Sequence, residues 1–157
     1  MDDRQFRTAM GKFATGVTVI ATEVDGNVHG MTANAFMSVS LDPRLVVISI
    51  GEKARILEKI KQSKTFSVNI LAANQQELSM IFAGQLKEHR EVEFDRLDGK
   101  PVLNGAVAQI ACEVSAEHLE GDHTVFIGKV TDIHLEDAEP LIFYSGKYRA
   151  LAETVTV

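Results

Sequence analysis

Cysteine is nearly absent from this sequence, because Cys112 is the only one among 157 residues. No disulfide can therefore form within the chain. A structural zinc site needs four ligands, usually cysteines and histidines, and one thiol cannot supply them. The five histidines show neither an HExxH motif nor an i, i+4 helical pair. We therefore predict no metal site, and we expect Cys112 to be a small buried strand residue.

Long apolar runs and an excess of basic residues are also missing. The stretch LVVISI is far shorter than the roughly 20 apolar residues that a membrane-spanning helix needs. Sixteen basic residues against 22 acidic ones give a net charge of −6, which argues against a nucleic-acid or membrane surface. The start, MDDRQFRTAM, has no secretory signal pattern. These features predict a cytoplasmic protein that binds neither nucleic acid nor a membrane.

Motifs of hydrolases and nucleotide-binding loops are absent as well. There is no GxSxG elbow and no GxGxxG fingerprint. The stretch GKFATG is followed by Val17 and Thr18 in place of the Lys-Ser/Thr of a phosphate-binding loop. Hydrolytic and metal-dependent chemistry therefore have little support.

Hydrophobic periodicity predicts many strands and few helices. Apolar residues make up 45% of the chain, enough for one globular domain over residues 1–157. Helical spacing is found in three short segments, at 6–13, 52–63 and 74–82. Strand patterns occupy 17–24, 28–37, 45–50, 65–71, 106–120, 123–136 and the segment from 140.

The order of these elements predicts a mainly β protein. There is no regular βαβ alternation and no internal repeat, so a doubly wound parallel sheet is not expected. Long antiparallel hairpins favour a closed or nearly closed barrel. The apolar run 45–50 is typical of a central strand buried on both faces, and 84–105 is expected to be a long irregular loop.

Three short segments are candidates for ligand binding. Gly51 precedes a predicted helix start that carries Lys53 and Arg55, a pattern that can hold an anion or simply form a solvated helix face. Gly121, Asp122 and His123 lie at a predicted hairpin tip. They either turn the chain or place an imidazole over a ligand.

The third candidate is HGMTANAFMSVSLDP at 29–43, which has strand alternation but small, hydroxylated side chains. Such residues leave room for a flat ligand with a polar edge. They are equally at home on a partly exposed edge strand, and the composition does not distinguish the two interpretations.

Five blocks in this order resemble the flavin reductase family with the FMN-binding split-barrel fold. They are FATGVTVIAT, HGMTANAFMSVSLDPRLVVISI, ARILEKIKQSKTFSVNIL, GDHTVFIGKV and PLIFYSGKY. The similarity spans nearly the whole chain. It is narrowest to the small reductase components of two-component aromatic monooxygenases that act on phenol or 4-hydroxyphenylacetate.

The resemblance implies a single domain with a six-stranded antiparallel Greek-key split barrel and a few short flanking helices. It further implies a homodimer that uses NADH or NADPH to reduce FAD or FMN, with hydride passing from nicotinamide C4 to flavin N5. Free flavin would be a substrate, and the reduced flavin would leave for a separate oxygenase component.

The resemblance also implies which residues form the site. Those expected to line the isoalloxazine ring are Thr32, Ala33, Asn34, Ala35, Ser38, Val39 and Ser40. Those expected to meet the ribityl chain and phosphate are Ser49, Ile50, Gly51, Lys53, Ala54 and Arg55. Phe82, Ala83 and Gly84 match an FAG stretch near the flavin. His123, the implied catalytic residue, would face the nicotinamide with Tyr148 and Arg149.

Two alternatives to this function stay open. One is a split-barrel flavoprotein that retains its flavin and reduces another acceptor. The other is a non-catalytic module that binds flavin or haem. The resemblance to phenol hydroxylase reductases favours FAD over FMN, whereas the sequence does not distinguish NADH from NADPH or identify the oxygenase and its substrate.

Overall fold

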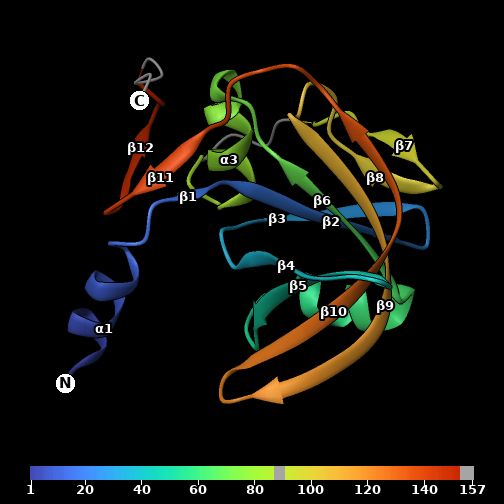
Figure 1. Cartoon of the computed structure of the whole chain (residues 1–157). Coiled ribbons are helices and arrows are strands. Elements are labelled where there is room, and N and C mark those ends of the chain that lie inside the picture. Colours follow the sequence, from blue (N-terminus) through green and yellow to red (C-terminus); the bar gives the residue numbers. More distant parts are fainter. Residues whose placement is uncertain (87–90, 153–157) are drawn as a thin grey trace.

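A curved seven-stranded antiparallel sheet forms the centre of the structure, a computed structural model that describes residues 1–86 and 91–152 (Figure 1). The strand order across the sheet is β3-β2-β6-β9-β10-β5-β4. In chain order the bounds are β2 Thr18–Val24, β3 Asn27–Ala33, β4 Phe36–Leu41, β5 Arg44–Gly51, β6 Thr65–Ile70, β9 Ala108–Glu120 and β10 His123–Leu135. The mainly β class predicted from the sequence is confirmed.

The two edge strands of this sheet are neighbours in the chain. Only Asn34 and Ala35 separate β3 from β4, although these strands lie at opposite ends of the strand order. The amide of Phe36 donates to the Asn34 carbonyl at 2.9 Å, and the amide of Ser49 donates to the Ala35 carbonyl at 3.3 Å. The edges must therefore converge at this point, which closes one end of a split barrel. The predicted run 28–37 is in fact two strands, so the sheet has seven strands instead of six.

The β9–β10 hairpin is the longest in the structure, as its alternating pattern predicts. Each strand has 13 residues, and Gly121 turns the chain between them with φ +62°. Phe126 on β10 packs in the main core with Ile20, Ile48 and Phe66, which are all fully buried. Cys112 on β9 is buried in the same core, and this burial raises the pKa of its thiol to about 12. Cys112 is therefore the inert hydrophobic residue that was expected.

The prediction that the run 45–50 is buried on both faces is wrong. In β5, Val46, Ile48 and Ile50 are buried, while Leu45, Val47 and Ser49 between them are only partly buried. The curved sheet encloses the core on one side, so alternate residues of β5 face away from it. Its apolar composition does not reveal this difference.

Three short α-helices flank the sheet: α1 Asp3–Met10, α2 Ile56–Ser63 and α3 Gln76–Phe82. The helix predicted from residue 52 begins only at Ile56, since residues 52–55 form a turn in which the Ala54 amide donates to the Gly51 carbonyl at 3.0 Å. The helix predicted from residue 74 begins at Gln76, because Asn74 lies in a 3-10 turn, Ala73–Gln75, before α3. Side-chain Oε1 of Gln75 accepts a hydrogen bond from the Ala72 amide at 2.9 Å.

The segment 84–105 is more ordered than predicted. It contains a short hairpin of β7 Asp95–Leu97 and β8 Lys100–Val102, and β8 is buried against β6. The hydroxyl of Ser67 on β6 donates to the Pro101 carbonyl at 2.5 Å. Residues 87–90 lie outside the described residues.

A second, smaller sheet joins the two ends of the chain. It consists of β1 Thr15–Gly16, β11 Ile142–Tyr144 and β12 Lys147–Arg149. In Figure 1, α1 stands apart from the barrel, and it has no buried residue. None of the described helices has both the length and the apolar character to cross a bilayer.

Candidate functional site

The end of β5 and the start of β10 meet at one corner of the barrel. His123 pairs with Gly51 in the β5–β10 ladder, and the Glu52 amide donates to the Asp122 carbonyl at 2.8 Å. Gly51 has no side chain, and the imidazole of His123 lies over it. A Cβ on Gly51 would stand 3.5 Å from Nε2 of His123. The hairpin tip and the predicted anion-binding turn are therefore one site.

Asp122 fixes the orientation of the His123 ring. Nδ1 of His123 lies 2.7 Å from Oδ1 of Asp122, and this hydrogen bond is the main reason why the pKa of Asp122 is lowered. An ionised carboxylate can only accept, so Nδ1 carries the proton and Nε2 is the nitrogen on the Gly51 side. Lys53 directly follows Glu52, whose amide pairs with the Asp122 carbonyl, and its charge lowers the Asp122 pKa further. We call Gly51, Lys53, Asp122 and His123 the glycine corner.

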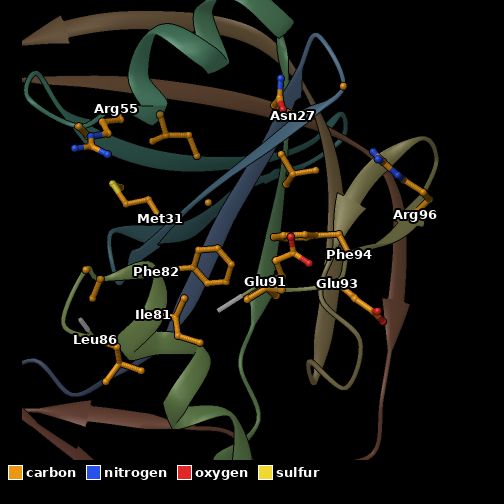
Figure 2. Close-up of a pocket in the computed structure, with 18 residues that line it drawn as sticks. Asn27, Met31, Arg55, Ile81, Phe82, Leu86, Glu91, Glu93, Phe94 and Arg96 are labelled. Carbon is orange, nitrogen blue, oxygen red and sulfur yellow. The ribbon is translucent and has the colours of Figure 1, made fainter. Parts of the chain in front are cut away.

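A cavity of about 1060 Å³ opens beside the glycine corner (Figure 2). It is bounded by β3, the start of α2, the end of α3 and residues 91–96. Its lining residues are Gly26, Asn27, Val28, Gly30, Met31, Ala54, Arg55, Ile56, Ile81, Phe82, Ala83, Gly84, Leu86, Glu91, Val92, Glu93, Phe94 and Arg96. Five predicted site residues are therefore found in one cavity: Ala54, Arg55, Phe82, Ala83 and Gly84.

Phe82 occupies the middle of this cavity because Gly30 leaves room for it. A Cβ on Gly30 would approach Cδ1 and Cε1 of Phe82 to 2.6 Å, so the ring packs directly on the β3 backbone. Phe82 also meets Phe94 edge to face, with ring centroids 5.8 Å apart at 62°. The glycine of the HGMTANAF block is thus needed for aromatic packing at the cavity.

The predicted isoalloxazine-lining residues follow the edges of the split barrel. Thr32 donates to the Ser79 carbonyl at 2.6 Å, and Ala33 packs against the main core. The other five are Asn34, Ala35, Ser38 and Val39, which are exposed, and Ser40, which is partly buried. Asn34 and Ala35 connect β3 to β4, the other three lie on β4, and none of the five is among the residues that line the cavity.

Two predicted residues have clear structural contacts. The Ile50 side chain is fully buried in the core, so only its backbone is available to a ligand. Tyr148 is hydrogen-bonded through its hydroxyl to Oγ of Ser79 at 2.7 Å, and its ring packs edge to face on Phe143. In Figure 1, β12 and the start of β10 lie well apart, so a single chain does not bring Tyr148 next to His123.

The sequence analysis missed the wall formed by residues 91–96. Val92 and Phe94 both line the cavity, and they alternate with Glu91, Glu93 and Asp95. This period of two was a detectable strand-like signal, but the surrounding charge made it resemble a loop. Arg96, at the end of this wall, forms an ion pair with Glu23.

The site consists of groups that can position a ligand. Among the described residues, the hydrogen bonds at this site pair no nucleophile with a base. In the described ranges, 1–86 and 91–152, no cluster of three or more histidine, cysteine or acidic side chains forms a metal site. The arrangement offers cations, small residues, aromatic rings and one oriented imidazole. Such a surface can bind and align a planar anionic molecule.

Comparison with known proteins agrees with this geometry. Residues 10–152 match the family described as the flavin reductase like domain. An NADH-dependent flavin reductase from a Rhodococcus species is 46% identical over 148 residues, covering 92% of this chain and 84% of the relative. The reductase component of 4-hydroxyphenylacetate 3-monooxygenase from Thermus thermophilus is 37% identical over 147 residues, covering 93% and 95%.

Solved structures show the same similarity. The flavin reductase PheA2 in its native state superposes with a TM-score of 0.96 at 63% identity, covering 98% of this chain and 100% of that one. An NADH:FAD oxidoreductase from Streptomyces globisporus, in complex with NAD and FAD fragments, gives a TM-score of 0.92 at 34% identity, covering 99% and 96%.

Proposed function

Because the chain belongs to the flavin reductase-like family and is an NAD(P)H-dependent flavin reductase, we propose that the flavin it reduces leaves for a separate oxygenase component. The Thermus relative supports this step, since its name makes it the reductase component of a monooxygenase. The observation that supports flavin reduction at this site, the step before release, is the glycine corner. It places an oriented imidazole beside Lys53 and next to a cavity large enough for a dinucleotide.

The residues present fit a flavin and NADH. When bound, the flavin accepts the hydride that the reduced nicotinamide gives up. Lys53 and Arg55, with backbone amides of the turn 51–55, would bind the flavin phosphate. The small residues from Thr32 to Ser40 would let the ring system lie close to the barrel edge. His123, fixed by Asp122, would hold the nicotinamide against it.

An assay of NADH oxidation tests this function. The purified protein is expected to oxidise NADH when free FAD, FMN or riboflavin is added, at a rate that still rises beyond one flavin per chain. A rate that saturates at one equivalent would indicate a flavoprotein that retains its flavin. No acceleration over the mixture of NADH and flavin alone would contradict a reductase and favour a binding module.

Substitution of His123 is expected to affect the nicotinamide more than the flavin. In His123→Ala we expect kcat/KM for NADH to fall about tenfold or more, because the reacting rings lose a positioning group. The dissociation constant for flavin should change far less. Steady-state kinetics and flavin fluorescence titration measure the two quantities.

His118→Ala is the matched control, since His118 is exposed on the β9 strand of the same hairpin. It should leave both quantities unchanged. An equal loss of NADH turnover and flavin affinity in His123→Ala would assign His123 to flavin binding or folding instead.

We further propose that the protein is a homodimer. The apolar face of α1 is uncovered in a single chain, since Phe6 and Met10 are exposed by 53% and 57%. Phe13, in the turn that follows the helix, is exposed by 79%. An isolated helix of eight residues is marginal in water, so a partner surface is needed to stabilise it. Exposed Met37 and Leu41 on the edge strand β4 offer a second apolar surface.

Placing a charge on this surface is expected to weaken the dimer. In Met37→Asp the dimer dissociation constant should rise on the order of 100-fold, because an unpaired buried charge costs several kcal/mol. Light scattering coupled to size exclusion measures the mass. Asn104→Asp, which adds the same charge on an exposed loop, should remain a dimer. A dimeric Met37→Asp protein, or a monomeric wild type, would contradict this interface.

A further inference from the structure

One polar side chain of α3 is completely buried and is paired with a distant tyrosine. Ser79 lies in the middle of this helix and has no exposed surface. Its hydroxyl is 2.7 Å from the hydroxyl of Tyr148, which lies on β12, 69 residues further along the chain. A buried hydroxyl without a partner costs more free energy than a typical hydrogen bond contributes. The Ser79–Tyr148 hydrogen bond therefore holds α3 and the small terminal sheet together.

The backbone of the same serine holds α3 against the barrel. The Ser79 carbonyl accepts from the Thr32 hydroxyl of β3 at 2.6 Å and from the Ala83 amide at 3.0 Å. Ser79 is thus bonded to β3 through its backbone and to β12 through its side chain, and in Figure 1 α3 lies between these two strands. Bonds to two separate sheets fix both the distance of α3 from β3 and its rotation about its own axis.

The part of α3 that these bonds position is the end that lines the cavity. Phe82 lies three residues after Ser79, so both residues are on the same side of the helix. The Phe82 ring packs on the backbone of Gly30, only 2.6 Å from where a Cβ would stand. Ala83 and Gly84 follow it in the cavity wall. A small shift of α3 would therefore open this packing or press the ring into β3.

The tyrosine itself is firmly held. Its ring meets Phe143 of β11 edge to face, with ring centroids 5.5 Å apart. Both rings pack against the buried cluster that contains Val17, Leu71 and Leu141. A side chain that is locked by its packing can present its hydroxyl at a fixed place, which is what a positioning group requires.

We propose that Ser79 and Tyr148 are positioning residues for flavin reduction, because their hydrogen bond keeps the end of α3 in the arrangement that binds flavin. The inference rests on the proposed function, which places the flavin phosphate at the 51–55 turn beside this cavity and the ring system along the edge that begins at Thr32. Neither side chain is assigned a contact with the flavin or the nicotinamide. Tyr148 thus acts through α3 and not through the nicotinamide contact implied by the family resemblance.

Tyr148→Phe removes the hydroxyl and keeps the ring. We expect the dissociation constant for flavin, measured by fluorescence titration, to rise about five- to tenfold, in line with the loss of one buried hydrogen bond. Bound flavin restores the position of α3, so kcat at saturating flavin should change less than about twofold. Ser79→Ala breaks the same bond from the other side. The double variant should therefore bind flavin no more weakly than the weaker of the two single variants.

Tyr144→Phe is the matched control. It removes a tyrosine hydroxyl from β11 of the same small sheet, and in the part of the chain that the structure describes this hydroxyl has no hydrogen bond. Its flavin affinity should equal that of the wild type. Hydrogen exchange tests the position of α3 without flavin or activity. In Tyr148→Phe the amides of Ala83 and Gly84 should exchange about tenfold faster, whereas those of α2 should be unchanged.

Three results would overturn the proposal. The first is a Tyr148→Phe protein with wild-type flavin affinity and wild-type amide exchange. The second is an equal loss of flavin affinity in Tyr148→Phe and Tyr144→Phe, which would make the hydroxyl a general contributor to stability. The third is an additive loss in the double variant, which would mean that the two side chains do not act through one bond.

The proposed function fails in a different way. A rate of NADH oxidation that saturates at one flavin per chain would contradict release of the flavin to an oxygenase. The expected loss of flavin affinity and the faster exchange in Tyr148→Phe would still support the positioning pair. A protein that releases reduced flavin but shows neither effect in this variant keeps the proposed function and loses the positioning pair.

Discussion

Replacing Gly128 with alanine is expected to lower the free energy of unfolding by about 3 kcal/mol, at the upper end of the usual range for overpacking. Gly128 lies on β10, beneath the ring of Phe66. A Cβ there would overlap Cζ of Phe66, stand 3.0 Å from its Cε1 and lie 3.1 Å from Cβ of Cys112. Phe66 and Cys112 are fully buried, so the ring has little room to move.

Thermal unfolding measures this effect. A loss of about 3 kcal/mol corresponds to a Tm lower by roughly 6–12 °C for a chain of this size. Gly16→Ala is the matched control, because Gly16 is also a strand glycine but a Cβ there would have no neighbour within 4 Å. Its Tm should stay close to that of the wild type. A Gly128→Ala protein with a wild-type Tm would show that Phe66 moves aside without cost.

Removing both cations of the 51–55 turn is expected to weaken flavin binding by about 1–3 kcal/mol, which is roughly 5- to 150-fold in the dissociation constant. The Lys53→Ala, Arg55→Ala double variant would remove the two charge-assisted contacts that we propose for the flavin phosphate. Lys53 follows Glu52, whose amide donates to the Asp122 carbonyl, and Arg55 lines the cavity, so the two cations lie on one short turn between the glycine corner and the cavity. Fluorescence titration with FMN and FAD measures the loss.

Riboflavin separates phosphate binding from other causes, because it has the same ring system without a phosphate. Its affinity should change little in the double variant. Lys59→Ala, Lys61→Ala removes the same charge from α2 itself, outside the 51–55 turn, and should keep wild-type FMN affinity. Unchanged FMN affinity in the Lys53, Arg55 variant, or an equal loss for riboflavin, would contradict a phosphate site. The turn would then be only a solvated surface.

The parts of the candidate site that consist of short sequence motifs were predictable from the sequence. Gly51, Lys53 and Arg55 form a recognisable glycine-then-cation turn, and His123 follows a Gly-Asp pair at a hairpin tip. Whether they act together was not predictable, because His123 lies over Gly51 only through the register of β10 on β5. Pairing between strands far apart in the chain leaves no local trace in either strand.

The sequence by itself determined the mainly β class, the long β9–β10 hairpin and the turn at Gly121. These depend on alternation and on backbone conformations that glycine favours, which are local properties. Only the tertiary structure decided which face of β5 is buried, how the edges of the sheet meet at Asn34 and Ala35, and which residues share the cavity. Burial and proximity depend on how the sheet curves, and that curvature is a property of all its strands together.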